Sequence, residues 1–277
     1  MSHTEMINTH YAARCILDRI QAGLETMGIA PRQATLDHLG KVDEFHVRGM
    51  DATSELIELL HAASDMHVLD LGCGLGGPAR RLASVTGCRV TGIDLNEEFC
   101  AAGTAINRWL RFENQVELMH EDATNLERFG TATFDAAWTL HAAMNIADKP
   151  GFYLEVARVL KPDARFVNYD IVTEDKGELY YPVPWAGDAA TSFLVTRDKM
   201  TALLRQAGFE IESIQDQTAE GLVFLTAALT RMAGSSPPPL GPHLVMGPET
   251  PLKLGNLAKN FEQGRVALVA VVCRLNA

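Results

Sequence analysis

Residues 67–83 read HVLDLGCGLGGPARRLA, and this stretch decides the fold. A short apolar run ends in a cluster of four glycines, which opens directly into a run of residues with helical spacing. The order predicts a strand, a tight turn and a helix, the first crossover of a nucleotide-binding type of fold, with backbone N–H groups directed at a ligand. Asp70 is the unusual residue, because a carboxylate at the end of a buried strand needs a partner. We expect a bound cofactor to be that partner.

Short apolar segments alternate with segments of helical periodicity after this stretch. Such alternation predicts a parallel sheet covered by helices on both faces. A helix over 151–160 is expected to end sharply at Lys161-Pro162-Asp163, and a Pro- and Gly-rich loop is expected at 235–251. The expected strands are 68–71, 88–94, 115–120, 134–140, 165–172, 209–214 and 266–273.

The first 65 residues are predicted to be largely helical and precede the first strand. Apolar positions three and four apart predict one helix over 8–27 and another over 52–63, whereas 38–50 shows no clean period. These helices are surplus to a minimal nucleotide-binding fold, so we expect them to form a lid or a homodimer surface. The expected division is a lid at 1–65 and a ligand-binding domain at 66–277, with a helical insertion at about 216–263 before the last strand.

The composition argues against several classes of protein. At 277 residues the chain is long enough for one large core with an appended subdomain. No segment approaches the ~20 apolar residues of a membrane span, and the N-terminus lacks the pattern of a secretory signal. The five scattered cysteines fit neither a disulfide framework nor a zinc site, so we expect a reduced, cytoplasmic protein without a metal. A net charge of −11 without a basic stripe argues against nucleic acid as a partner.

The glycine cluster satisfies the dinucleotide pattern G-x-G-x-x-G at Gly72, Gly74 and Gly77, and Asp94 lies 20 residues beyond Gly74. Asp70 decides between adenosine cofactors. A dinucleotide brings a pyrophosphate to this turn, and a nearby carboxylate would repel it by several kcal/mol at an effective dielectric constant of about 20. S-adenosylmethionine brings an ammonium and a sulfonium instead, so an acid at this position favours its binding.

The expected cofactor contacts follow from this choice. Asp94 would accept hydrogen bonds from both ribose hydroxyls, and Asp122 would accept one from the adenine amino group, with the Ala123 N–H at the ring. Taken singly, a glycine cluster is an ordinary turn and Asp94 is a helix N-cap with Glu97 as its partner. Together they predict a cofactor site formed by Asp70, Gly72, Cys73, Gly74, Asp94, Leu95, Asp122, Ala123 and Leu140.

This combination of motifs closely resembles the class I S-adenosylmethionine-dependent methyltransferases. The matching segments are VLDLGCGLGG at 68–77, the acid Asp94, HEDA at 120–123 and ARVLKPDARFV at 157–167. The resemblance implies an α/β, Rossmann-like fold with a seven-stranded, mostly parallel sheet whose last strand is antiparallel. It also implies S-adenosyl-L-methionine as methyl donor, S-adenosyl-L-homocysteine as product and a small-molecule acceptor.

The segment DEFHVRGMDATSEL at 43–56 is similar to the one that precedes the first motif in sarcosine, dimethylglycine and phosphoethanolamine N-methyltransferases, where it covers the cofactor. The similarity favours an amine nitrogen as the acceptor atom. The alternative is O- or C-methylation of a phenol, a quinol or another natural product.

Methyl transfer is an in-line displacement that needs alignment, exclusion of water and, for some acceptors, removal of a proton. His141 follows the fourth strand and is the candidate proton acceptor, while a neutral histidine bonded to backbone is the structural alternative. Tocopherol-type methyltransferases carry a histidine in an EHMPDK-like segment, and alignment on Asp148-Lys149 puts Asn145 at that position. The candidate acceptor-binding residues are Phe45, His46, Asn145, Tyr181 and Trp185.

Two other functions fit parts of the pattern. A nicotinamide-dependent dehydrogenase would explain the glycines, but Asp70 and the lack of a second nucleotide-binding half argue against it. A non-catalytic subunit that keeps the fold and the cofactor would explain every motif and transfer no methyl group.

Overall fold

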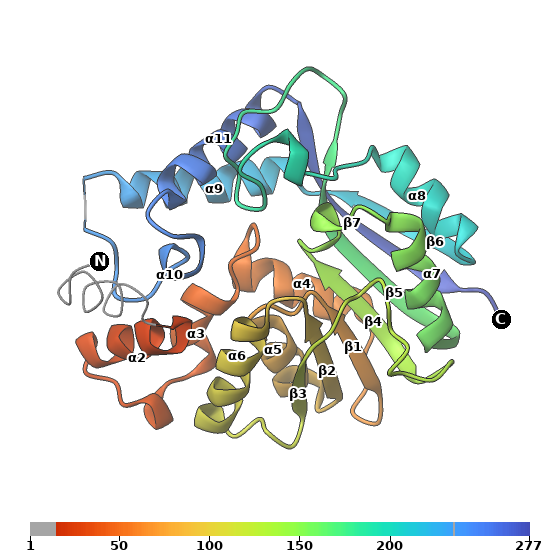
Figure 1. Ribbon diagram of the computed structural model, residues 1–277, viewed down its shortest axis with the longest axis horizontal. Helices are drawn as coiled ribbons and strands as arrows, with labels where there is room; N and C mark the ends of the chain where they lie inside the picture. Colours follow the sequence, from red (N-terminus) through yellow and green to blue (C-terminus); the bar gives the residue numbers. More distant parts are fainter. Residues whose placement is uncertain (1–14, 235) are drawn as a thin grey trace, which may run out of the picture.

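A computed structural model describes residues 15–234 and 236–277. Its centre is one seven-stranded sheet with the strand order β3-β2-β1-β4-β5-β7-β6 (Figure 1). Strands β1 to β5 are parallel, and β7 is antiparallel to both of its neighbours. The predicted α/β class, with seven strands and an antiparallel last strand, is confirmed. The strands are β1 His67–Leu71, β2 Arg89–Asp94, β3 Val116–His120, β4 Phe134–Leu140, β5 Leu160–Thr173, β6 Phe209–Asp216 and β7 Val266–Leu275.

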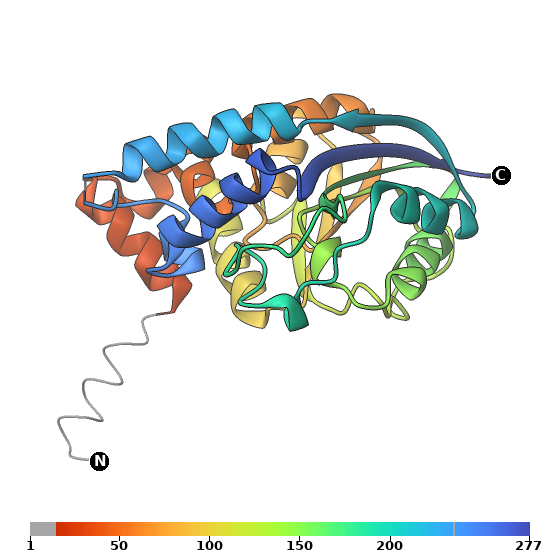
Figure 2. The same cartoon turned by 90° about the horizontal axis from the view of Figure 1, so that it is seen from above.

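Helices cover both faces of the sheet, because successive strand side chains alternate between two apolar layers. Helices α4, α5, α9 and α11 pack on one face, and α7 and α8 pack on the other (Figure 2). The bounds are α2 Ile16–Thr26, α3 Leu36–Asp43, α4 Gly49–Leu60, α5 Gly77–Thr86, α6 Glu97–Leu110, α7 Lys149–Val159, α8 Arg197–Gln206, α9 Thr218–Met232, α10 His243–Met246 and α11 Thr250–Glu262. Short 3-10 turns are η1 Pro31–Gln33, η2 Ala143–Asn145 and η3 Ala189–Thr191.

Three segments differ from the prediction. The stretch without a clean period contains the end of α3, the connection 44–48 and the start of α4, and Arg48 directly before α4 has a left-handed backbone with φ 70°. Lys161-Pro162-Asp163 lies inside β5, where an irregularity in the pairing with β4 accommodates it, so this strand begins at Leu160. The predicted 235–251 loop contains the short helix α10. Residues 8–14 of the first predicted helix lie outside the described residues.

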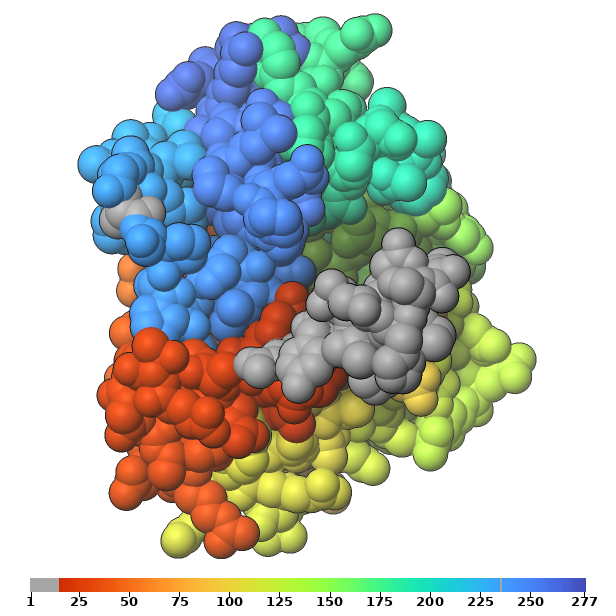
Figure 3. Space-filling model, turned by 60° about the vertical axis from the view of Figure 1, so that its left-hand side comes forward, coloured from red at the N-terminus to blue at the C-terminus, as the bar shows by residue number. Residues whose placement is uncertain are grey.

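A third apolar cluster joins the N-terminal helices to the rest of the chain. It combines α2 and α3 with α6 and with Leu240, which precedes α10. The surface of these N-terminal helices, red in Figure 3, meets the blue surface of the segment around α10 and α11. Segments far apart in the sequence therefore share one core on this side of the molecule.

Gly77 lets α3 approach the glycine loop closely. A Cβ at this position would lie 2.5 Å from the backbone oxygen of Asp43 and 2.6 Å from its Oδ1. Asp43 in turn binds the buried guanidinium of Arg80, with 2.7 Å between Oδ2 and Nη2. The third glycine of the pattern thus admits a protein segment.

No helix of the described ranges, 15–234 and 236–277, is both long and apolar enough to cross a membrane.

Gly77→Ala should lower the free energy of unfolding by about 1–3 kcal/mol, because the added methyl group overlaps backbone that has little room to move. Gly255→Ala in α11 is the matched control, since nothing lies within 4 Å of its added Cβ. That change should stabilise the protein by about 0.5–1 kcal/mol through helix propensity. Urea unfolding measures the free energy of unfolding of both variants. An equal change at the two positions would contradict the close approach of Asp43 to Gly77.

Candidate functional site

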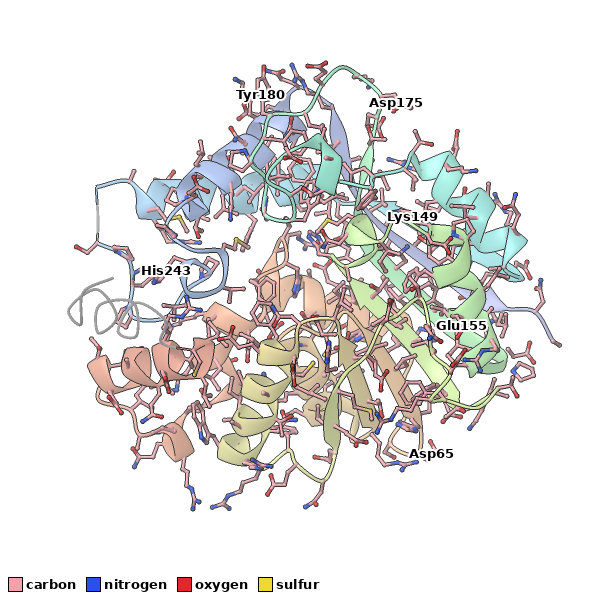
Figure 4. All side chains as sticks on the ribbon, in the orientation of Figure 1. Asp65, Lys149, Glu155, Asp175, Tyr180 and His243 are labelled. Carbon is pink, nitrogen blue, oxygen red and sulfur yellow. The ribbon has the colours of Figure 1, made fainter. Side chains whose placement is uncertain are left out.

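The acidic residues predicted from the sequence lie at the carboxyl edge of the parallel sheet. Asp70 is the next-to-last residue of β1, Asp94 ends β2, and Asp122 follows β3. His141 follows β4 at the same edge. The opposite edge is marked in Figure 4 by Asp65, which precedes β1. Parallel strands bring these side chains to one edge because their carboxyl ends point the same way.

Asp70 is buried without a complete set of partners. Its side chain is only 2% exposed, and Oδ2 has no hydrogen-bond partner. Burial raises the pKa of this carboxyl to about 7. Trp138 is paired with Asp70 across β1 and β4, and its indole N–H faces the carboxyl group and partly offsets the rise in the pKa, although the geometry gives Nε1 no well-formed hydrogen bond. The end of β1 therefore presents an acid that a cationic ligand would stabilise in its charged form.

The amides of the glycine loop are already used inside the protein. The N–H groups of Gly72 and Cys73 both donate to the carbonyl oxygen of Ile93, at 2.8 and 2.9 Å. Gly74 N–H donates to Asp94 Oδ2 at 2.8 Å, and Gly76 N–H donates to the Cys73 carbonyl at 2.8 Å. The expectation that these N–H groups point at a ligand is therefore wrong, because the end of β2 accepts three of their hydrogen bonds and the loop itself accepts the fourth.

Asp94 and Asp122 differ in their surroundings. Asp94 also accepts from Asn96 N–H at 2.8 Å, and burial raises the pKa of its carboxyl. Asp122 is exposed and accepts from the N–H and the hydroxyl of Thr124 through Oδ1 alone. Leu95 is 70% exposed beside Asp94. Both acids keep lone pairs for further donors, since each carboxylate oxygen can accept two hydrogen bonds.

Three rings gather where β4 ends beside Tyr169, which lies inside β5 opposite Leu140. The ring centroid of His141 lies 5.1 Å from that of Tyr169 and 6.1 Å from that of His46. His141 has a left-handed backbone with φ 55°, held by its N–H bond to the Tyr169 carbonyl at 2.8 Å. Its Nε2 is buried and has no partner. Burial lowers the pKa of His141 well below the usual value, so its ring is neutral near pH 7.

His46 is held by its own segment. Its Nε2 donates to the Gly49 carbonyl at 2.9 Å, and burial lowers its pKa to about 4. The preceding Phe45 lies over the glycine loop, since a Cβ on Gly74 would come within 3.1 Å of its ring. Tyr169 connects β5 to the segment of His46, because its hydroxyl donates to the Val47 carbonyl at 3.2 Å.

The other acceptor-side candidates lie farther along the chain. Asn145 is exposed in η2, and Tyr181 is half-buried. Trp185 donates from Nε1 to Ser192 Oγ at 2.9 Å and packs against the core. Sequence reasoning missed Trp138 and Tyr169, although both occupy the alternate strand positions that share a sheet face with Asp70.

In the described part of the chain, no group of three or more His, Cys, Asp and Glu side chains is arranged to hold a metal ion.

Comparison with known proteins matches residues 69–168 to a family described as a methyltransferase domain. Sterol 24-C-methyltransferase from Eremothecium gossypii is 34% identical over 158 residues, which cover 54% of this chain and 42% of that protein. O-methyltransferase cnsE from Penicillium expansum is 30% identical over 182 residues, covering 64% of this chain and 63% of that one. The chain thus spans about half the length of the curated relatives it matches.

A solved structure has the same fold. Geranyl diphosphate C-methyltransferase from Streptomyces coelicolor A3(2), in complex with Mg2+, geranyl diphosphate and S-adenosyl-L-homocysteine, superposes with a TM-score of 0.67 at 19% identity. The match covers 81% of this chain and 78% of that one. At this identity the likeness shows the fold.

Asp70→Asn should change how stability depends on pH. The folded pKa of Asp70 is about 7, well above the ordinary value, so the protonated acid favours the folded state. Relative to this variant, the wild type should have a contribution to the free energy of unfolding that is fully present below about pH 4. This contribution should be lost as the pH rises through 7, and it amounts to about 4 kcal/mol. Urea unfolding from pH 4 to 8 measures it. Asp65→Asn, at an exposed position, is the control. If the free energy of unfolding depended on pH in the same way in the wild type and in Asp70→Asn, the raised pKa of Asp70 would be contradicted.

Proposed function

We propose that the chain is a class I S-adenosylmethionine-dependent methyltransferase, which transfers the methyl group of S-adenosyl-L-methionine to a small-molecule acceptor; the methyltransferase-domain match at residues 69–168 supports this proposal. The cofactor would supply an electrophilic methyl group on a cationic sulfur. The protein would hold the cofactor, align the acceptor and exclude water.

One observation carries this proposal: the glycine loop offers a carboxyl group where a nucleotide-phosphate site would offer amides. The four loop amides described above bond within the protein, whereas Asp70 Oδ2 lacks a partner. A phosphate would find few donors here and a negative charge beside it. An ammonium group would satisfy Asp70 and stabilise its charged form. This argues against the nicotinamide dehydrogenase.

The cofactor would occupy the carboxyl edge over Gly72, Cys73 and Gly74. Asp94 would accept from the ribose hydroxyls through its remaining lone pairs, and Asp122 from the adenine amino group beside Ala123. Leu95, with most of its side chain exposed, would cover the adenine, and Leu140 would border the methionine part. Phe45, already packed on Gly74, would close over the loop, in line with a lid role for the N-terminal helices.

We place the acceptor beside His141, with an amine nitrogen as the first choice of acceptor atom. A neutral imidazole accepts a proton, and the low pKa values of His46 and His141 keep both rings neutral at pH 7. The same base would serve a phenol, and the two curated relatives are named for carbon and oxygen methylation, so O- or C-methylation remains the alternative. A homodimer and a cytoplasmic location remain predictions from the sequence.

Asp94→Ala should weaken S-adenosylhomocysteine binding by about 2–3 kcal/mol, roughly 30- to 150-fold, because charge-assisted bonds to two hydroxyls are lost. Isothermal titration calorimetry measures the dissociation constant, with Asp65→Asn at the far edge of the sheet as control. An unchanged constant would move the cofactor elsewhere, and tight NADH binding without S-adenosylhomocysteine binding would overturn the proposal.

His141→Ala should slow methyl transfer by about 10²- to 10⁴-fold if its Nε2 removes a proton from the acceptor. The assay follows labelled methyl from S-adenosylmethionine into a panel of amines and phenols. The wild-type rate should show no histidine titration between pH 6 and 8, because the pKa of His141 lies well below this range. His61→Asn, at the exposed end of α4, is the control. Retained turnover in His141→Ala would make His141 structural, and label on no compound would favour a non-catalytic subunit.

A further inference from the structure

Lys149 is an unusual residue for its position. It is the first residue of α7, where the helix dipole disfavours a positive charge, and it is only 3% exposed. The helix already has an N-cap, since Asp148 accepts from Gly151 N–H at 3.0 Å. The lysine is therefore not needed to begin the helix, and its burial requires another explanation.

Three backbone carbonyls surround the ammonium group. Lys149 Nζ donates to the oxygens of Ala143 at 2.8 Å, Ile146 at 2.9 Å and Phe193 at 2.5 Å. An ammonium group has three N–H donors, so all of them are used. The arrangement replaces the water that a lysine loses on burial, and it does so with groups from two separate segments.

The two segments border the proposed acceptor site. Ala143 and Ile146 belong to the turn that directly follows His141. Phe193 belongs to the segment between β5 and α8. Trp185 lies in the same segment and donates to Ser192, the residue before Phe193. A backbone bond from Phe193 N–H to the Met144 carbonyl at 3.0 Å lies beside the ammonium contacts. Figure 4 labels Lys149 at the start of α7, where these segments meet.

We propose that Lys149 is a positioning residue, whose ammonium group holds the His141 turn and the Trp185–Phe193 segment together as the two sides of the acceptor site. The acceptor site in this inference rests on the proposed methyltransferase function. The link between the two segments rests on the three hydrogen bonds from Lys149 Nζ. Lys149 touches neither cofactor nor acceptor in this account; it acts through Ala143, Ile146 and Phe193.

A nearby carboxyl group supports the charge on the lysine. Burial lowers the pKa of Lys149, and the charge on Asp170, a buried residue of β5 whose own pKa burial raises to about 7, partly opposes that shift. Asp170 accepts from the Ile171 N–H at 2.9 Å, and within residues 15–234 and 236–277 it forms no direct ion pair with Lys149. The carbonyls are thus the groups that fix the position of Nζ.

Hydrogen–deuterium exchange on the full-length protein tests the proposal with Lys149→Met, which keeps an unbranched side chain and removes the donors. Exchange should become about tenfold faster in peptides covering 141–147 and 190–195, while peptides from β4 and β5 stay unchanged. The dissociation constant for S-adenosylhomocysteine should change less than about twofold. Lys161→Met, at the opposite end of β5, is the control and should leave both segments unchanged.

Chemical rescue separates positioning from bulk stability. In Lys149→Ala, added n-propylammonium should restore the slow exchange of both segments, whereas propyltrimethylammonium, which has the same charge but no N–H donor, should not. If neither variant folds, wild-type protein with ¹⁵N-labelled lysine should show one ammonium signal protected from solvent exchange at neutral pH. Unchanged exchange in the two segments, faster exchange throughout the sheet without rescue, or the lack of a protected signal would each overturn the proposal. Failure of the wild type to bind S-adenosylhomocysteine would overturn the proposed function and leave these readings intact.

Discussion

The site depends on one fully buried guanidinium. Arg80 in α5 donates to Asp43 Oδ2 at 2.7 Å, to the Leu75 carbonyl at 2.7 Å and to Asn107 Oδ1 at 2.7 Å. These partners come from the N-terminal helices, the glycine loop and α6, so one side chain fixes all three relative to each other. Losing one partner of such a pair typically costs 3–5 kcal/mol, because the other charge stays buried. Gly77 makes the arrangement possible, since only a residue without Cβ lets Asp43 come this close.

The conformation of the glycine loop is fixed by Arg80 and by hydrogen bonds to the end of β2. Ile93 accepts two loop amides through its carbonyl, and Asp94 accepts a third through its side chain. The loop is therefore shaped without a ligand, and its free polar group is the acid of Asp70. A loop that satisfies the dinucleotide pattern by spacing thus has the electrostatics of a site for a cation, because its donors are bonded inside the protein.

The sequence was sufficient to predict the strands of the sheet and the position of Asp70, Asp94 and Asp122 at one edge of it. Apolar runs mark parallel strands, and the carboxyl ends of parallel strands share one edge. It was insufficient where a property depends on register or on distant segments. The bonds from the loop to Ile93 require the pairing of β1 with β2. The grouping of His46, His141 and Tyr169 joins the segment before α4 to residues that lie 95 and 123 positions later in the chain. The cage around Lys149 uses carbonyls, which every residue carries, so no side-chain pattern marks it.

Burial has opposite consequences on the two sides of the site. It raises the pKa of Asp70 to about 7, so this acid is only partly charged until a cation arrives. It lowers the pKa values of His46 and His141, so both rings stay neutral and retain proton-accepting capacity. A single physical cause, the removal of water, thus leaves one side with an acid that a positive ligand would stabilise and the other side with uncharged imidazoles, which are weaker bases than free histidine. Because a neutral pocket gives little electrostatic orientation, the acceptor must be aligned by shape, which requires that the segments around it be held in place.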